Sequence, residues 1–224
     1  TLMRSSAASD VYKRQMQDIF EDYEVKNIYM PRVADDMSAT WTKTVAAIEE
    51  ETWTNESGET VDSEIYYTVG DFVIQGEDWT MNCHSYLEDD YPSVKESSSA
   101  EVKNAVSPVC FLEYADRTIV LTGDSNERNE EYLLERGVLD KDADVLKVGH
   151  HGSRTSTIQE FLNAVDCEYA IVSYGEDNDY GHPTPELMSR LEDYTDVRPD
   201  NDYNGYKYIY ETPKDGNVSV YVDG

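Results

Sequence analysis

Hydrophobic and polar residues follow a regular pattern over the second half of the chain. Two apolar runs joined by Ala-Asp-Arg predict a β-hairpin over residues 109–121. Short apolar runs predict buried strands at 144–148 and 169–173, and the tail predicts a closing hairpin of residues 206–210 and 218–222. Apolar residues at helical spacing predict helices over about residues 127–136, 157–165 and 184–194. Strands and helices alternate, so this half is expected to be α/β.

The first half has a weaker pattern. It predicts a strand at 25–30 and a helix at about 38–51. Residues 52–82 alternate between apolar and polar positions, which is typical of short antiparallel strands. Residues 88–104 are rich in Ser and acidic side chains and are expected to form a loop.

The first 15 residues, TLMRSSAASDVYKRQ, differ from the rest because they carry three basic side chains and show no periodicity. They resemble translated adapter sequence from environmental shotgun assemblies, and we exclude them from the fold. The domain is therefore expected over residues 16–224. The chain is expected to be a fragment of a longer protein.

Charge and composition limit the function. The chain has 224 residues, with 47 acidic against 18 basic side chains and a net charge of -29. Nucleic-acid affinity depends on clustered Lys and Arg, so no general nucleic-acid-binding surface is expected. No apolar run has the length of a membrane helix, so the chain is expected to be soluble with no membrane segment. The compartment stays open between cytoplasmic and secreted or exoplasmic.

The three cysteines, Cys83, Cys110 and Cys167, lie far apart in the sequence. They form neither a disulfide framework nor a Cys-x-x-Cys metal motif. We expect them to be core thiols.

Metal-capable residues follow three successive predicted strands. Asp124 follows the first, His150 and His151 follow the second, and His182 lies beyond the third. Such strand ends meet at one edge of an α/β sheet, so we expect these side chains to gather in one cleft. An Asp with imidazoles suits a divalent cation such as Zn or Mn.

Each motif also has a structural alternative. Thr-Gly-Asp is a common turn after a strand, His-His-Gly is more often a turn or a helix cap, and His182 could simply pack beside Pro183. His84 has no partner motif and is expected to be structural. Only the combination of the three motifs favours a metal site.

The combined motifs resemble a known family. Thr122-Gly-Asp124, the run from Asp142 to Ser156 and Tyr180-Gly-His-Pro183 are similar to metallo-β-lactamase-fold hydrolases. The most similar subgroup is the domain attached to the DNA-uptake channel ComEC, with its stand-alone relatives. The resemblance covers about residues 16–200 and implies an αββα sandwich. The family's H-x-H-x-D-H motif is absent here, so the domain is expected to be N-terminally truncated.

The resemblance also implies roles for individual residues. Asp124 would bridge two divalent metal ions, zinc or manganese, and one of His150 and His151 would be a ligand. His182 and Asp124 would be catalytic. The substrate-binding residues would be Asn104, Ser153 and His182, although Asn104 begins Asn-Ala-Val-Ser where the family has Asn-Asp-x-Ser.

The expected activity is metal-dependent hydrolysis, in which a metal-bound hydroxide attacks a phosphodiester or another ester. The substrate would be a small phosphodiester or a nucleic acid processed during DNA uptake. Because too few ligands are present, this fragment is expected to be inactive while its intact parent is an enzyme. The alternative is a non-catalytic binding or scaffold domain of the same fold.

Overall fold

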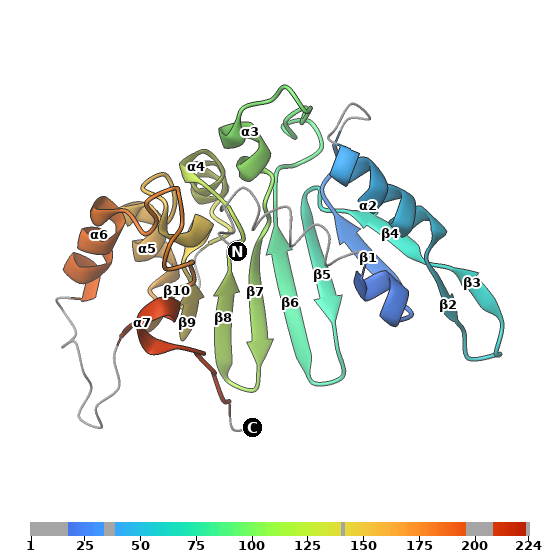
Figure 1. Ribbon diagram of the computed structural model, residues 1–224. Coiled ribbons are helices and arrows are strands. Elements are labelled where there is room, and N and C mark those ends of the chain that lie inside the picture. The colour runs from blue at the N-terminus through green and yellow to red at the C-terminus, as the bar shows by residue number, and fades with distance from the viewer. Residues whose placement is uncertain (1–17, 34–38, 140–141, 196–207, 223–224) are drawn as a thin grey trace. The chain divides into compact units, whose positions relative to one another are not determined.

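The computed structural model describes residues 18–33, 39–139, 142–195 and 208–222 (Figure 1). The chain forms two compact units. The first contains the residues up to Thr68 together with Ser93–Ser98, and the second contains Val69–Pro92 and the residues from Ser99 onward. None of the helices in the described ranges is long and apolar enough to cross a membrane.

The first unit has two small sheets, a helix of twelve residues and a helical segment at residues 18–22. Strand β1 (Asn27–Met30) pairs in parallel with β4 (Glu64–Tyr67), and β2 (Thr52–Thr54) pairs antiparallel with β3 (Thr60–Asp62). Helix α2 (Ala39–Glu50) packs its apolar side against β1. The buried side chains of this small core are Ile28, Met30 and Ile48.

The second unit is built on a seven-stranded sheet in the order β11-β10-β9-β8-β7-β6-β5. Strands β5 to β8 run antiparallel to their neighbours, whereas β8 to β11 run parallel. The parallel part requires helical crossovers, which the chain supplies between successive strands. The strand bounds are Asp71–Gln75, Trp79–His84, Val109–Tyr114, Arg117–Leu121, Val145–Lys147, Tyr169–Val172 and Ile209–Glu211, for β5 to β11 in turn.

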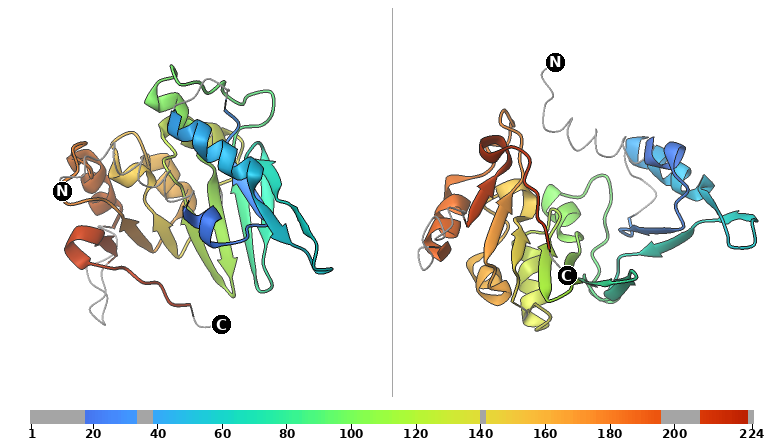
Figure 2. Two further views of the ribbon diagram at one scale, coloured as in Figure 1. Left: turned by 45° about the vertical axis from the view of Figure 1, so that its right-hand side comes forward. Right: turned by 90° about the horizontal axis from the view of Figure 1, so that it is seen from below.

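Helices cover one face of this sheet. Helices α4 (Glu127–Glu135) and α5 (Gln159–Val165) lie side by side on that face (Figure 2). Helix α6 (Pro185–Thr195) adds Leu187 and Leu191 to the same core. The sheet contributes alternate side chains, as the period of two requires, and these are Val109, Phe111, Val120, Leu146, Ala170 and Val172.

Most expected elements of the second half are confirmed within one or two residues, and the α/β class is confirmed. The sheet and the helices on its face form an α/β layer pair, as expected for an αββα sandwich. Two expectations were wrong. Strand β11 pairs in parallel with β10 and leads into α7 (Thr212–Asp215), so the tail is not a hairpin. Residues 206–207 lie outside the described residues.

The second error concerns the first half. The antiparallel strands expected over residues 52–82 are confirmed for β2 with β3 and for β5 with β6. Strand β4 differs, because it pairs in parallel with the distant strand β1. The expected loop at 88–104 also ends in a short helix, α3 (Ala100–Ala105), whose N-terminus is capped by the Ser99 hydroxyl. The excluded residues 1–15 lie outside the described residues.

Candidate functional site

The expected site residues follow the carboxyl ends of three neighbouring strands. Asp124 follows β8, His150 and His151 follow β9, and Ser173 directly follows β10. These strands are parallel and in register, with Leu121 opposite Lys147. Their carboxyl ends therefore meet at one edge of the sheet, which is where ligands bind in α/β proteins.

Asp124 and His151 contact each other at this edge. His151 Nε2 lies 3.5 Å from Asp124 Oδ1, and both side chains are about half exposed, at 45% and 44%. His151 Nδ1 lies 2.8 Å from the Ser173 carbonyl oxygen. Because a carbonyl can only accept, Nδ1 carries a proton, which leaves Nε2 as the ring nitrogen that faces Asp124 and could bind a metal ion. A ring held this way is typical of histidines that bind metals.

His150 lies next to His182 and Asn104. The His150 and His182 rings meet edge to face with centroids 5.3 Å apart. Asn104 Nδ2 lies 3.3 Å from His150 Nε2. Burial lowers the pKa of His150 and that of His182, so both rings are neutral near pH 7.

The two adjacent histidines have an unusual backbone. His150 and His151 have φ angles of 44° and 55°, in the left-handed region that side chains other than Gly and Asn rarely adopt. The loop is held by hydrogen bonds from its backbone N–H groups, since His150 N–H donates to the Gly123 carbonyl and Gly149 N–H donates to the Thr157 side-chain oxygen Oγ1, each at 3.0 Å. Such strain persists only where surrounding contacts impose it, and it is common at functional sites.

A buried carboxylate supports the same loop from α4. Glu130 is fully buried and accepts the backbone N–H groups of Thr157 and Ile158 at 2.7 and 2.8 Å. Burial raises the pKa of Glu130 to about 7. Arg190 of α6 donates to the carbonyls of Ser156 and Thr157. Two helices therefore fix the segment that carries His150 and His151.

Gly152 brings the His182 loop to the histidine pair. A Cβ at Gly152 would lie 2.5 Å from Pro183 Cβ, and its φ of 87° also favours glycine. The Gly152 carbonyl accepts the Thr184 N–H at 2.9 Å. This close approach positions His182 beside His150.

Lys147 is a site residue that the sequence pattern did not single out. It alternates with the core residue Leu146, and its Nζ donates to the Val148 carbonyl at 2.6 Å. Burial lowers the pKa of Lys147, and the negative charge of Asp124 opposes that shift. The alternation within 144–148 was the available signal, since it places a cation on the face opposite the core.

The structure brings most of the expected residues together but does not form a complete metal shell. Asp124 pairs with His151, while His150 is surrounded by Asn104 and His182. Ser153 is buried, and its hydroxyl lies 3.0 Å from Thr155 Oγ1 within the same turn. Within the described ranges, no group of three or more His, Cys, Asp or Glu side chains is arranged to hold a metal ion.

The Asp124 and His151 pair nevertheless suits one ion. Donors about 2.0–2.2 Å from one tetrahedral zinc ion lie about 3.4 Å apart, which is close to the observed 3.5 Å. The carboxylate oxygen and the imidazole lone pair are also donor types that zinc accepts. The described residues thus fit two positions of a coordination shell and leave the others to be filled.

Comparison with known proteins agrees with these features. Residues 100–176, which include Asp124, His150 and His151 but not His182, match the metallo-beta-lactamase superfamily model. The chain is 35% identical to ComE operon protein 3 of Bacillus subtilis (strain 168) over 127 residues, 56% of this chain and 16% of that protein.

Two further relatives are named for competence and recombination. The chain is 42% identical over 88 residues to competence protein ComA of Neisseria gonorrhoeae, covering 39% of this chain and 13% of that protein. It is 38% identical over 91 residues to recombination protein 2 of Haemophilus influenzae, covering 41% and 11%. The chain therefore matches only a small part of each relative. The chain is therefore similar to the metallo-beta-lactamase superfamily over residues 100–176 and to short parts of proteins that are named for competence and recombination.

Proposed function

We propose that this chain is part of a metal-dependent hydrolase that cleaves a phosphodiester or another ester. The observation that carries the proposal is the pair formed by Asp124 Oδ1 and His151 Nε2, 3.5 Å apart, with His151 oriented by the Ser173 carbonyl. This pair combines two zinc-compatible donors and a second-sphere hydrogen bond.

Asp124 and His151 would hold the divalent ion, with zinc the expected metal and manganese a possible substitute. When bound, the ion would supply Lewis acidity toward an ester or phosphoryl oxygen. By analogy with two-ion hydrolases, Asp124 would bridge to a second ion in the complete protein.

The neighbouring side chains would act on the substrate. His182 is neutral and half-buried, so it can hold a hydrogen bond to the leaving oxygen or transfer a proton there. Asn104 keeps His150 in place through its amide. Ser153 would contribute to substrate binding through the turn in which its hydroxyl meets Thr155 Oγ1.

The positive charge of Lys147 favours an anionic substrate. Its ammonium group donates one hydrogen bond to the Val148 carbonyl, and an ammonium carries three N–H donors. A phosphodiester oxygen near Asp124 would meet this cation in a partly desolvated setting, where charge-assisted hydrogen bonds are strong. The overall charge of -29 disfavours a long nucleic acid and favours a small phosphodiester or a short single strand.

A non-catalytic binding or scaffold domain is the second candidate. It is favoured by the lack of any three-donor cluster among the residues that the structure describes. Two donors bind a metal weakly, so we propose that the chain alone is inactive and that a longer parent protein supplies the remaining ligands.

The test uses that longer parent. Its hydrolysis of bis(p-nitrophenyl) phosphate is measured before chelation, after chelation and after zinc or manganese is added back. The hydrolase proposal expects activity that is lost on chelation and restored by metal. A parent that binds metal in full and still hydrolyses none of several phosphodiesters and carboxylic esters would favour the scaffold alternative.

A further inference from the structure

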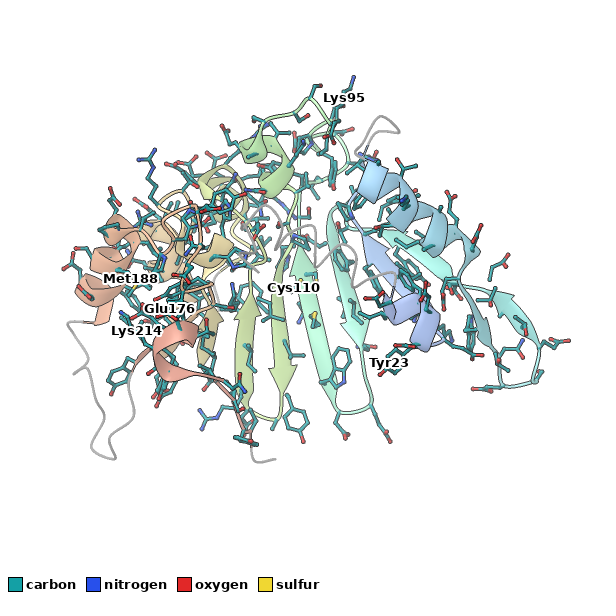
Figure 3. The ribbon with its side chains drawn as sticks, in the orientation of Figure 1. Tyr23, Lys95, Cys110, Glu176, Met188 and Lys214 are labelled. Carbon is teal, nitrogen blue, oxygen red and sulfur yellow. The ribbon has the colours of Figure 1, made fainter. Side chains whose placement is uncertain are left out.

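Cys83 and Cys110 face each other across neighbouring strands of the seven-stranded sheet. Cys83 lies on β6 and Cys110 on β7, and the two are direct partners in the antiparallel register. The labelled side chain of Cys110 lies in the central part of the sheet, where these strands run side by side (Figure 3). Both cysteines are reduced.

The register gives the pair disulfide-compatible geometry. Directly opposed residues of an antiparallel pair have Cα atoms about 4.5–5.5 Å apart. A disulfide forms without backbone movement when this distance is about 4.4–6.8 Å. Opposed side chains also project from the same face of the sheet, so the two sulfurs meet.

The two thiols already interact. A hydrogen bond from Cys110 lowers the pKa of Cys83, and the same bond together with burial raises the pKa of Cys110. Cys83 is 1% exposed, whereas Cys110 is partly exposed and gives a small reagent access to the pair. A dithiol in which one thiol stabilises the thiolate of the other is activated for disulfide exchange.

We propose that Cys83 and Cys110 form a reversible redox pair that closes to a disulfide in the folded chain. The oxidant is a small disulfide such as oxidised glutathione. A thiolate of the pair attacks one sulfur of the oxidant, which releases one glutathione thiolate and leaves a mixed disulfide. The second cysteine loses its proton and attacks the protein sulfur, which releases the other glutathione. The two protein thiols are oxidised, and one disulfide becomes two glutathione thiols.

The bond would act near the candidate site. It would tie β6 to β7, and Cys110 is itself the register partner of Leu121 on β8, the strand that leads to Asp124. The same row of the sheet continues to Lys147. Oxidation therefore adds a covalent bond between β6 and β7, within the row of paired residues that crosses the sheet to Lys147.

The test is a glutathione redox titration of the 224-residue chain, followed by alkylation and peptide mapping. On oxidation, the free thiols are expected to fall from three to one, and the map is expected to contain a peptide that joins Cys83 to Cys110. Adding dithiothreitol should restore all three thiols. The product should migrate as a monomer on a non-reducing gel.

Cys167 provides the matched control, because it is buried in the helix-side core at 2% exposure. On oxidation, the number of free thiols in Cys167→Ser is expected to fall from two to none. Cys83→Ser and Cys110→Ser are each expected to keep two free thiols. The wild-type peptide map needs no variant and so decides the matter even if a variant fails to fold. The proposal is overturned if the wild-type chain keeps three thiols, if Cys167 enters the disulfide, or if the Cys83–Cys110 link forms equally in urea.

Discussion

The imidazole of His151 is held between Asp124 and the Ser173 carbonyl, with Nε2 3.5 Å from the carboxylate oxygen and Nδ1 2.8 Å from the carbonyl oxygen. The ring orientation is thus set by the end of β10, while the carboxylate is set by the end of β8. The His150 ring instead meets Asn104 and His182. Of the two adjacent histidines, His151 is therefore better oriented than His150 to bind a metal ion.

This difference predicts unequal effects on metal affinity. His151→Ala should weaken zinc binding by at least about tenfold, because it removes a donor and its second-sphere bond together. His150→Ala should weaken it less, since its ring meets an amide and a second imidazole. Competition with a zinc-sensitive dye measures both variants. A larger loss in His150→Ala than in His151→Ala would reverse the assignment.

The buried carboxylate of Glu130 predicts a pH-dependent stability. Its pKa is raised from an ordinary value near 4.5 to about 7 by burial. Between about pH 4.5 and 7, the folded chain still holds a proton on Glu130 that the unfolded chain has lost. The contribution of Glu130 to the free energy of unfolding is therefore largest below about pH 4.5 and declines as the pH rises to about 7. Glu130→Gln should remove this component of the pH slope.

Urea unfolding at several pH values checks the slope. Glu130→Gln should also lose about 1–3 kcal/mol, because an amide nitrogen then faces one of two backbone N–H donors. Glu131→Gln is the control, since Glu131 is exposed on the same helix. It should keep the wild-type slope. Identical slopes for wild type and Glu130→Gln would show that Glu130 does not titrate in this window.

The contact of Gly152 with Pro183 predicts a large cost for a single methyl group. Gly152→Ala should lower the free energy of unfolding by about 2–5 kcal/mol, because a left-handed φ and a steric overlap act together. Gly137→Ala has a positive φ but no atom near its Cβ, and it should lose only about 1 kcal/mol. Thermal unfolding compares the two. Equal losses would mean that the loop moves away from Pro183 freely.

Replacing Lys147 in the longer parent should raise KM selectively for anionic substrates. Lys147→Met should raise KM for bis(p-nitrophenyl) phosphate by about 10–100-fold, which corresponds to one charged hydrogen bond. KM for the neutral ester p-nitrophenyl acetate should stay near the wild-type value. If both substrates are affected alike, Lys147 supports the fold of the site and not the charge of the substrate.

The sequence pattern predicted the elements whose signal is local. The hairpin that leads to Asp124 and the helix that begins near Glu127 carry complete patterns of apolar spacing and capping, and both are confirmed. The pairing of β4 with β1 and of β11 with β10 was missed, because strand partners are chosen by tertiary packing and not by the residues of one strand.

The site was predictable in part for the same reason. Strand ends of a parallel sheet converge, so the position of Asp124 relative to His150 and His151 followed from topology. The choice between the two histidines did not, because it depends on which ring reaches the Ser173 carbonyl. Glu130 was also missed, since burial contacts between distant elements leave no signal in local spacing. Lys147 was missed although the alternation within 144–148 carried a signal for it.

The most direct test of the account measures zinc content and bis(p-nitrophenyl) phosphate hydrolysis together, in the longer parent and in its Asp124→Ala variant. Asp124→Ala is expected to lose bound zinc and most of the hydrolysis rate, while His182→Ala is expected to keep its zinc and turn over more slowly. An Asp124→Ala variant with unchanged zinc content and an unchanged rate would contradict it.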